Sequence, residues 1–430
     1  MRVLIVRSTP FLAILIFSLF SINPSKSQTA FRKSVEQDFK RWISQVRTEA
    51  RAAGVSEKTL SVALKNVKLD WKLPDLKIPR PPGHKIPKQK KKRQPEFDRP
   101  GRYFPESRLK SLTATGRQKL VSLGREFTLI EERYGVQRSV VLAIWGRETA
   151  FGSYKMRHDA IRALATQGFM GARKEYFREQ LLFALKILDE GHVEKSKMRS
   201  SWAGAMGYTQ FLPSDFRDYA VDFDGDGRKD IWNSKTDALA SAANALKVNG
   251  WNAGMTWGYE VRRPKGFDCT LEGPEGRRTI AEWKALGLTR TFNRKFDANR
   301  FKILANLLTP TGRSGPAFLV LDNFFVIKTY NFSNLYALYV GNLADRIGGE
   351  RSFETSWPKV DGFTRDEVRR MQTRLSEFGY EVGKLDGIIG PLTRVAVGRF
   401  QKKLGKSATC FPTRVLFNKI LNQDPKGYRG

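Results

Sequence analysis

Apolar residues recur at steps of three and four along most of this chain, which is the spacing of one face of an α-helix. Residues 117–134 show it with Leu120, Leu123 and Phe127. The same pattern covers four stretches: residues 30–70, 106–190, 238–248 and 334–347. Within the first of them, residues 55–57 are expected as a turn with a helix N-cap. We therefore expect a mainly α-helical protein.

Two short segments, residues 258–263 and 317–330, depart from the helical pattern and are strand-like. In the second, Phe318-Leu-Val-Leu and Phe324-Phe-Val-Ile flank the turn-forming pair Asp322-Asn323, which predicts a β-hairpin. A small β region is thus expected inside a mainly helical domain.

Residues 71–102 interrupt the helices with seven prolines and the basic run 88–93. Proline removes backbone donors and like charges repel each other, so we expect an extended, solvated connection. Contact with a polyanion and a plain basic loop are equally compatible with this composition.

The net charge of +33 indicates a polyanionic partner, such as nucleic acid, an anionic membrane surface or an acidic wall polymer. At the N-terminus, Arg2 and Arg7 precede the apolar run 11–20, and small residues follow. This pattern predicts a secretory signal peptide over residues 1–27. The run is short for a membrane anchor, and no Cys follows it to carry a lipid. An exported protein does not normally meet DNA, so no nucleic-acid partner is expected.

A second boundary lies near residues 356–362, where the tail begins a pattern of its own. Val368, Met371 and Leu375 form one helix face, and further helical stretches cover residues 393–400 and 412–421. We expect a small three-helix domain over residues 360–425, preceded by a main domain over residues 28–355.

The two cysteines, Cys269 and Cys410, fall in different expected domains. An exported chain permits a disulfide, yet two cysteines in 430 residues do not make a disulfide-built protein. Two unpaired thiols are therefore favoured over a bridge.

Residues 140–154 carry a single carboxylate, Glu148, immediately after an apolar run. Ile144 lies four residues before Glu148, so the carboxyl falls on or beside an apolar helix face. A carboxyl group held against apolar surface resists ionisation, which suits a general acid. Taken alone, the stretch fits a surface salt bridge at a helix end at least as well.

Residues 201–216 alternate small residues with large flat ones and include Ser201, Gln210 and Phe211. Aromatic faces and amides suit sugar rings, although tight helix packing explains the pattern equally well. Tyr330 and Tyr336 flank a strand-to-helix junction that could form a ligand rim or a core.

Asp222, Asp224 and Asp226, followed by Gly227, match the first half of an EF-hand calcium loop. The twelfth position is Asn233 instead of Glu, so Asp230 or Asp237 would have to supply the missing oxygen. Three clustered carboxylates repel one another without a cation, which favours a structural calcium over a solvated turn.

Several motifs together resemble the membrane-bound lytic transglycosylase B family. They are Trp145-Gly-Arg-Glu148-Thr-Ala-Phe-Gly152, Ser201-Trp-Ala-Gly-Ala-Met-Gly-Tyr-Thr-Gln-Phe-Leu-Pro213, Tyr219-Ala-Val-Asp-Phe-Asp-Gly-Asp-Gly227 and Tyr330-Asn331 with Tyr336-Ala337. The tail, with Met371-Gln372, Gly379-Tyr380, Asp386-Gly387 and Phe400-Gln401, resembles a helical peptidoglycan-binding module.

The resemblance implies a lysozyme-like helical catalytic domain with an EF-hand-like loop. It also implies cleavage of the β-1,4 bond between N-acetylmuramic acid and N-acetylglucosamine without water, forming 1,6-anhydromuramyl products. Glu148 would be the single acid and base. A non-catalytic peptidoglycan-binding scaffold and a lysozyme-type muramidase are the alternatives.

The resemblance also implies the other site residues. Arg173, Ser201, Gln210, Phe211, Tyr330 and Tyr336 would bind the saccharide, and Asp222, Asp224, Asp226, Arg228 and Asp237 would surround calcium. No organic cofactor is expected. The implied location is the periplasm, with peptidoglycan as partner; wall-synthesis or secretion-system proteins and an anionic membrane surface stay open as further contacts.

Overall fold

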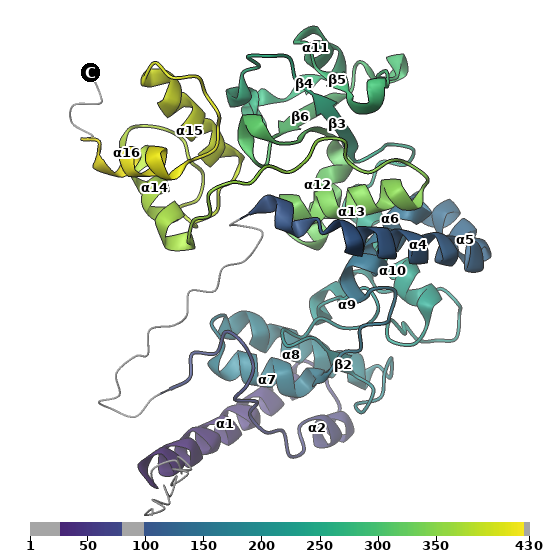
Figure 1. Cartoon of the computed structure of the whole chain (residues 1–430). Helices are drawn as coiled ribbons and strands as arrows, with labels where there is room; N and C mark the ends of the chain where they lie inside the picture. Colours follow the sequence, from purple (N-terminus) through teal and green to yellow (C-terminus); the bar gives the residue numbers. More distant parts are fainter. Residues whose placement is uncertain (1–25, 80–98, 425–430) are drawn as a thin grey trace, which may run out of the picture.

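The computed structural model describes residues 26–79 and 99–424 of the chain (Figure 1). The expected signal peptide and the basic run 88–93 lie outside these ranges, apart from residues 26 and 27, which open the first helix. Among the helices of the described ranges, none combines the length and the apolar character needed to cross a bilayer.

A lower lobe at the bottom of Figure 1 contains five helices packed around one apolar core. They are α1 (Lys26–Ala52), α2 (Glu57–Ala63), α7 (Ala160–Met170), α8 (Lys174–Asp189) and α9 (Pro213–Tyr219). The short strands β1 (His158–Asp159) and β2 (Arg199–Ser200) pair antiparallel beside them. The expected N-cap of α2 is confirmed, because the side chain of Ser56 accepts a hydrogen bond from the backbone N–H of Thr59.

An upper bundle holds six helices around a second core. They are α4 (Glu106–Ser122), α5 (Gly124–Tyr134), α6 (Arg138–Thr149), α10 (Lys235–Val248), α12 (Asp322–Tyr330) and α13 (Asn334–Ile347), preceded by the turn η1 (Pro100–Tyr103). Helix α6 is apolar nearly all round, and every residue from Val140 to Gly146 is buried. A helix of this kind belongs in the middle of a bundle.

The expected β region is a five-stranded antiparallel sheet in the order β4-β6-β7-β3-β5. The strands are β3 (Gly258–Arg262), β4 (Arg278–Thr279), β5 (Thr289–Arg290), β6 (Leu304–Leu308) and β7 (Ala317–Val320), with α11 (Ile280–Ala285) packed against them. The buried indole of Trp283 on α11 donates a hydrogen bond to the carbonyl of Ala305 at 3.0 Å. This bond ties the helix to the sheet.

The predicted hairpin after β7 is wrong. Strand β7 pairs with β3 on one side and β6 on the other, so neither edge is free for a following strand. The next segment is instead helix α12, in which Phe324 and Ile327 are buried while Phe325 is 41% exposed. This three-residue period identifies one apolar helix face, which a short apolar run does not reveal by itself.

The C-terminal module, residues 363–422, contains α14 (Arg365–Glu377), α15 (Pro391–Lys403) and α16 (Arg414–Asn422) around its own small core. Val368, Met371 and Leu375 face that core as the spacing predicts. The expected fold, mainly helical with a small β region and a three-helix tail, is confirmed.

The preference for two unpaired thiols is wrong, because Cys269 and Cys410 form a disulfide across 141 residues of sequence. Cys269 opens the short turn η2 (Cys269–Leu271) beside the sheet, and α15 of the module packs on that turn. Gly398 on α15 makes the approach possible, since a Cβ there would lie 2.5 Å from the sulfur of Cys410. The prediction was wrong because the two cysteines lie in different domains, and the sequence does not show that these domains pack against each other.

Candidate active site

Glu148 lies in the last turn of α6, and the chain reverses sharply after it. Ala150, Phe151 and Gly152 have φ angles of 48°, 58° and 82°, in the left-handed region that side chains rarely adopt. The ring of Phe151 folds back onto Trp145 with a centroid distance of 5.5 Å. Strained backbone of this kind persists only where its surroundings enforce it, and here it holds the end of α6 that carries Glu148.

The carboxyl of Glu148 has one hydrogen-bond donor among the described residues: the hydroxyl of Tyr336 on α13 donates to Oε1 at 2.6 Å. Burial raises the pKa of Glu148, and this effect outweighs the opposing effects of the Tyr336 hydrogen bond and the Arg147 charge. A carboxyl that keeps its proton to higher pH is suited to donate it. Among the described residues, no ion pair or hydrogen bond joins Glu148 to a second carboxylate.

Two tyrosines form the wall next to Glu148. The rings of Tyr330 and Tyr336 are parallel, with centroids 6.5 Å apart, and Phe211 packs on Tyr330 at 5.8 Å. The hydroxyl of Tyr330 donates to the carbonyl of Thr209 at 2.9 Å. Burial raises the pKa of both tyrosines well above the ordinary value, so both hydroxyls remain donors. Tyr336 therefore acts on Glu148, and Tyr330 holds the loop of Thr209.

The loop 201–211 presses against the end of α6. The hydroxyl of Thr149 donates to the carbonyl of Tyr208 at 2.7 Å. A Cβ on Gly152 would lie 2.6 Å from the ring of Tyr208, so only glycine allows this contact. The lower-lobe core and the upper-bundle core both include Tyr208 and Tyr330 at their edges. Glu148 thus lies where the two helical regions meet.

Within this loop, Gln210 adopts a left-handed φ of 58°. Its amide nitrogen donates to the carbonyl of Gly207 at 3.0 Å and contacts Met156 Sδ at 3.3 Å. Phe211 is only 2% exposed, and its backbone exchanges two hydrogen bonds with Met206. Phe211 is therefore a packing residue of the wall, and within the described residues the amide oxygen of Gln210 accepts no hydrogen bond.

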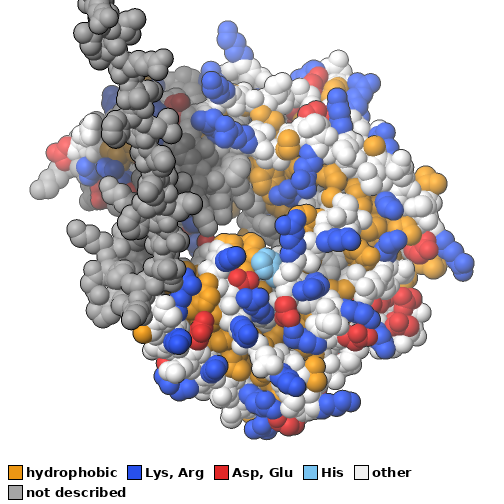
Figure 2. Space-filling model, turned by 60° about the horizontal axis from the view of Figure 1, so that its bottom comes forward, with side chains coloured by type: hydrophobic (Ala, Val, Ile, Leu, Met, Phe, Trp, Pro, Cys, Tyr) orange, Lys and Arg blue, Asp and Glu red, His pale blue; other side chains and the backbone are white. Residues whose placement is uncertain are grey.

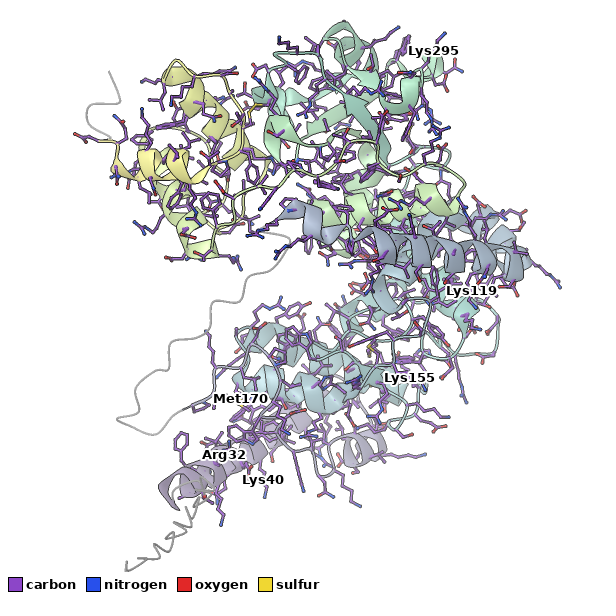
Figure 3. The ribbon with its side chains drawn as sticks, viewed as in Figure 1. Arg32, Lys40, Lys119, Lys155, Met170 and Lys295 are labelled. Carbon is purple, nitrogen blue, oxygen red and sulfur yellow. A yellow bond between two sulfur atoms is a disulfide. The ribbon has the colours of Figure 1, made fainter. Side chains whose placement is uncertain are left out.

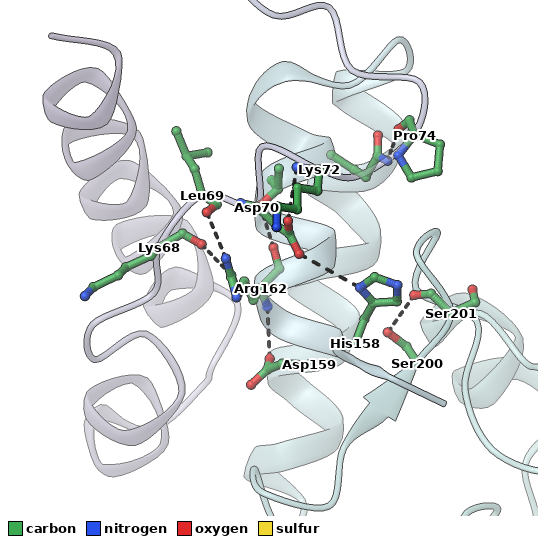
Figure 4. A network of polar contacts seen from close by, with 12 residues as sticks. Lys68, Leu69, Asp70, Lys72, Pro74, His158, Asp159, Arg162, Ser200 and Ser201 are labelled. Carbon is green, nitrogen blue, oxygen red and sulfur yellow. Dashed lines mark hydrogen bonds and ion pairs between the residues drawn. The ribbon is translucent and has the colours of Figure 1, made fainter. Parts of the chain in front are cut away.

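Ser201 and Arg173 lie on the lower lobe, and in the described ranges neither forms a hydrogen bond or ion pair with Glu148. The hydroxyl of Ser201 accepts the backbone N–H groups of Ala203 and Ala205 at 3.3 and 3.1 Å. Figure 4 shows Ser201 next to Ser200, beside His158. Arg173 is exposed at the start of α8 and lies over the ring of Tyr176 at 4.9 Å.

The segment before residue 80 crosses this same part of the lobe. In Figure 4 the guanidinium of Arg162 on α7 donates to the carbonyls of Lys68 and Leu69, both at 3.0 Å. The ring of His158 pairs with Asp70 at 3.9 Å. These bonds hold the segment against α7, on the side of Ser201.

Sequence reasoning missed Arg147, which supports the acid from the other side. Its guanidinium donates to the hydroxyl of Tyr103 at 2.7 Å and lies over the rings of Tyr103 and Tyr339, at 4.6 and 4.8 Å. Tyr339 follows Tyr336 by three residues on α13, so both rings lie on one face of that helix. Since Arg147 directly precedes Glu148, this spacing was the signal in the sequence that could have linked Arg147 to the site.

Three carboxylates of the acidic loop converge. Oxygen atoms of Asp222, Asp224 and Asp237 lie within 4.8 Å of one another. Asp237 is buried and accepts the backbone N–H groups of Phe223 and Asp230 at 2.8 and 2.9 Å. Oxygen ligands of this charge and spacing suit a hard cation such as calcium. Asp237, sixteenth in the loop, thus lies with Asp222 and Asp224, where the glutamate of the twelfth position is missing.

Asp226 and Arg228, which were also expected at the metal, and the alternative ligand Asp230 are not in this group of three carboxylates. Asp226 is exposed and outside the group of three, and its Oδ1 accepts the backbone N–H of Arg228 at 2.8 Å. Asp230 accepts the backbone N–H groups of Trp232 and Asn233. The carboxylates of the loop therefore accept hydrogen bonds from the loop's own backbone, and those of Asp237 link residues 223 and 230.

Basic side chains lie on several parts of the described structure. Figure 3 places Arg32 and Lys40 on α1, Lys119 on α4 and Lys295 beside the sheet. On the face in Figure 2, Lys and Arg side chains are dispersed among polar and hydrophobic ones and are more numerous than Asp and Glu. An excess of positive charge attracts anionic polymers.

Comparison with known proteins agrees with this geometry. Residues 38–345 match the family described as transglycosylase SLT domain, and residues 364–418 match the putative peptidoglycan binding domain. The membrane-bound lytic murein transglycosylase B of Escherichia coli K12 is 33% identical over 220 residues. That match covers 50% of this chain and 58% of the relative, so it spans less than two thirds of that protein.

Two solved structures from Pseudomonas aeruginosa extend the similarity. SltB3 in complex with NAG-anhNAM-pentapeptide is 40% identical, with a TM-score of 0.79, over 89% of this chain and 99% of that one. The soluble lytic transglycosylase SltB1 is 28% identical, with a TM-score of 0.58, over 72% of this chain and 98% of that one. The chain therefore belongs to the family of SLT-domain lytic murein transglycosylases, and it carries a C-terminal peptidoglycan-binding domain.

Proposed function

We propose that this protein cleaves the β-1,4 bond between N-acetylmuramic acid and N-acetylglucosamine in peptidoglycan and leaves a 1,6-anhydromuramyl end. The observation that carries the proposal is the single carboxyl of Glu148, whose pKa burial raises, hydrogen-bonded to the Tyr336 hydroxyl at 2.6 Å. The crystallised complex of SltB3 with NAG-anhNAM-pentapeptide, a protein 40% identical to this one, supports the product.

Glu148 acts twice in this reaction. Its proton passes to the glycosidic oxygen as the C1–O bond breaks, and positive charge develops at C1 of the muramyl sugar. The carboxylate then takes the proton of the muramyl C6 hydroxyl as that oxygen bonds to C1. Ordinary glycosidases use a second carboxylate for the nucleophile or base. Here the substrate's own hydroxyl takes that place, so one carboxyl suffices.

The neighbours of Glu148 suit both steps. The Tyr336 hydroxyl stabilises the carboxylate after it has given up its proton, because a hydrogen bond to the charged form favours that form. The nearby guanidinium of Arg147 adds a positive charge with the same effect. Gln210, Ser201 and Tyr330 would contact the saccharide, Phe211 would support them, and Arg173 would meet a carboxylate of the stem peptide.

The acidic loop serves as a structural calcium site in this proposal. Asp222, Asp224 and Asp237 supply carboxylate oxygens, and the calcium would hold the loop to the start of α10. Asp226 and the Arg228 backbone carbonyl would complete the shell. Removal of calcium by EGTA should then lower the melting temperature, and Asp237→Asn should abolish that response. Identical melting curves with EGTA and with added calcium would contradict the site.

Residues 28–355 form the catalytic region and residues 360–425 the wall-binding domain in this proposal, with residues 1–27 as the export signal to the periplasm. Peptidoglycan is the partner that the positively charged surface and the module both suit.

The decisive test is mass spectrometry of peptidoglycan digested by the full chain. We expect anhydromuramyl ends, and Glu148→Gln should lower their release by at least about a thousandfold, because proton donation and removal are both lost. Glu190→Gln, a carboxylate on the lower-lobe surface, is the matched control and should retain activity. Reducing muramyl ends would instead identify a lysozyme-type hydrolase. If no soluble product is released, the protein would be a non-catalytic binding scaffold.

A further inference from the structure

The module is docked on the catalytic region by several bonds. Besides the disulfide, the guanidinium of Arg394 donates two hydrogen bonds to the carboxylate of Glu272, at 2.9 and 2.5 Å, and both side chains are almost fully buried. Lys402 pairs with Asp268 at 2.7 Å. Any groove between the two parts therefore has walls that keep their positions relative to each other.

Such a groove exists, and we call it the trough. It consists of two adjoining cavities of about 420 Å³ each, which share Leu308, Lys328, Asn334 and Pro391. One cavity extends along the sheet and α12. The other extends along the junction of α12 and α13 and faces the loop 386–391 of the module. In Figure 1 the module lies on the same side of the molecule as the β region.

Lys328 in the wall of the trough is a half-buried cation without a partner. Among the described residues its ammonium forms no hydrogen bond or ion pair, and its nearest ring is Phe325, with the nitrogen 5.8 Å from the centroid. Asp386, the one carboxylate lining either cavity, does not pair with it. Burial lowers the pKa of Lys328, which shows that the site disfavours the bare charge. A carboxylate from a ligand would relieve that cost.

The same wall offers groups that suit a sugar. Phe332 is 90% exposed and lines the cavity next to the module. The side-chain amides of Asn331 and Asn334 form no hydrogen bonds within the described ranges, so both remain for hydroxyl or acetamido groups. Aromatic faces and amides are the groups that suit sugar rings and their acetamido substituents.

One segment of the chain links the trough to the wall beside Glu148. Residues 331–335, which line the trough, connect Tyr330 to Tyr336, the two tyrosines of the wall beside Glu148. The trough is therefore lined by residues that directly adjoin the two tyrosines of the wall in sequence.

We infer that the trough between α12 and the module is a second peptidoglycan site, in which Lys328 pairs with a stem-peptide carboxylate and Phe332 packs on a sugar ring. The inference rests on the proposed function for its ligand, a glycan strand that carries peptides. It assigns the module a role beyond tethering, because half of the site belongs to the catalytic region.

The test separates binding from chemistry. Lys328→Met and Phe332→Ala are placed in the full chain with Glu148→Gln, so that sacculi stay intact, and binding to sacculi is measured. Each should weaken binding about three- to fivefold. Lys119→Met and Val121→Ala on α4 are the controls and should bind normally. Lys119 is part-exposed and its side chain has no bonding partner among the described residues, and Val121 is exposed.

Two further measurements assign the ligand groups. On strands stripped of their peptides by an amidase, the Lys328→Met effect should vanish while the Phe332→Ala effect persists, and Lys328→Arg should restore binding to intact sacculi. In the active chain, turnover of a soluble substrate of two disaccharide units should match the wild type for every variant, because within the described residues neither Lys328 nor Phe332 forms a hydrogen bond or ring contact with Glu148, Tyr330 or Tyr336.

The outcomes are separable from those of the proposed reaction. Normal binding of both variants to sacculi would overturn the trough, and so would an equal loss of turnover on the short substrate, which would assign the residues to the active site or to stability. If the Lys328 and Phe332 variants bind sacculi more weakly but the active chain releases no anhydro product, the trough would be supported as a binding site and only the proposed reaction would be overturned.

Discussion

Two of the interfaces between parts of the described structure are held by different kinds of contact. One joins the lower lobe to the upper bundle, and the other joins the β region to the module. Where the lower lobe meets the upper bundle, Glu148 is framed by aromatic rings and neutral hydrogen bonds, such as Thr149 to Tyr208 at 2.7 Å. Where the β region meets the module, a disulfide and the buried Glu272–Arg394 pair close the interface. The proposed acid thus lies at a junction of aromatic and neutral hydrogen-bonded contacts, whereas a covalent bond and a buried ion pair anchor the module.

The largest effect is expected from breaking the ion pair at the module. Arg394→Met leaves the carboxylate of Glu272 buried without its cation, which should lower the free energy of unfolding by about 3–5 kcal/mol in chemical denaturation. Turnover of a short substrate should change little, since the pair is remote from Glu148.

Arg399→Met is the matched control for that variant. Arg399 faces Glu275 at 3.7 Å and both are exposed, so its loss should cost about 0–1 kcal/mol. Equal losses in the free energy of unfolding for the two variants would mean that burial does not make the Glu272–Arg394 pair stronger than an exposed one. The module would then not be anchored by that pair.

The disulfide should contribute somewhat less. Replacing Cys269 and Cys410 by Ser should lower the free energy of unfolding by about 2–4 kcal/mol, because the cross-link restricts the unfolded chain over a long loop. The melting temperature of the wild type should fall to that of the variant when reductant is added, and the variant should not respond. Titration of two free thiols in the native protein would refute the bridge.

The smallest effect in free energy is expected at the catalytic junction. Tyr336→Phe removes the hydroxyl bonded to Glu148 and should lower kcat/KM about tenfold, or about 1.4 kcal/mol. The Tyr336 hydrogen bond lowers the pKa of Glu148, so its loss raises that pKa further. Activity requires the protonated acid, hence the alkaline limb of the pH profile should move to higher pH.

The exposed Tyr154 supplies the control, and Tyr154→Phe should leave the pH profile unchanged. An alkaline limb that moves to lower pH in Tyr336→Phe would show that Glu148 does not set it.

Local patterns predicted the parts of the fold that depend on neighbours in sequence. The apolar run of α6, the N-cap at Ser56 and the core face of α14 all follow from residues within one or two turns. Glu148 at the end of α6 belongs to this class, because its place follows from the helix that carries it.

The features that were missed depend on contacts between distant segments. The hairpin after β7 was excluded by β3 and β6, which occupy both edges of that strand from elsewhere in the chain. The disulfide required the docking of two domains. The bond from Tyr336 to Glu148 joins residues 188 positions apart, and no local pattern indicates it. The sequence left Tyr336 open between a ligand rim and a core, and its side chain is buried.

The clamped module has a consequence for measurement along a polymer. A binding domain on a flexible linker raises the local concentration of its target but samples many separations. A domain held by a disulfide and a buried ion pair keeps one distance from Glu148. If Glu148 is the acid and the module binds the wall, as proposed, the fold fixes the distance along the glycan strand between the bound sugar and the cleaved bond.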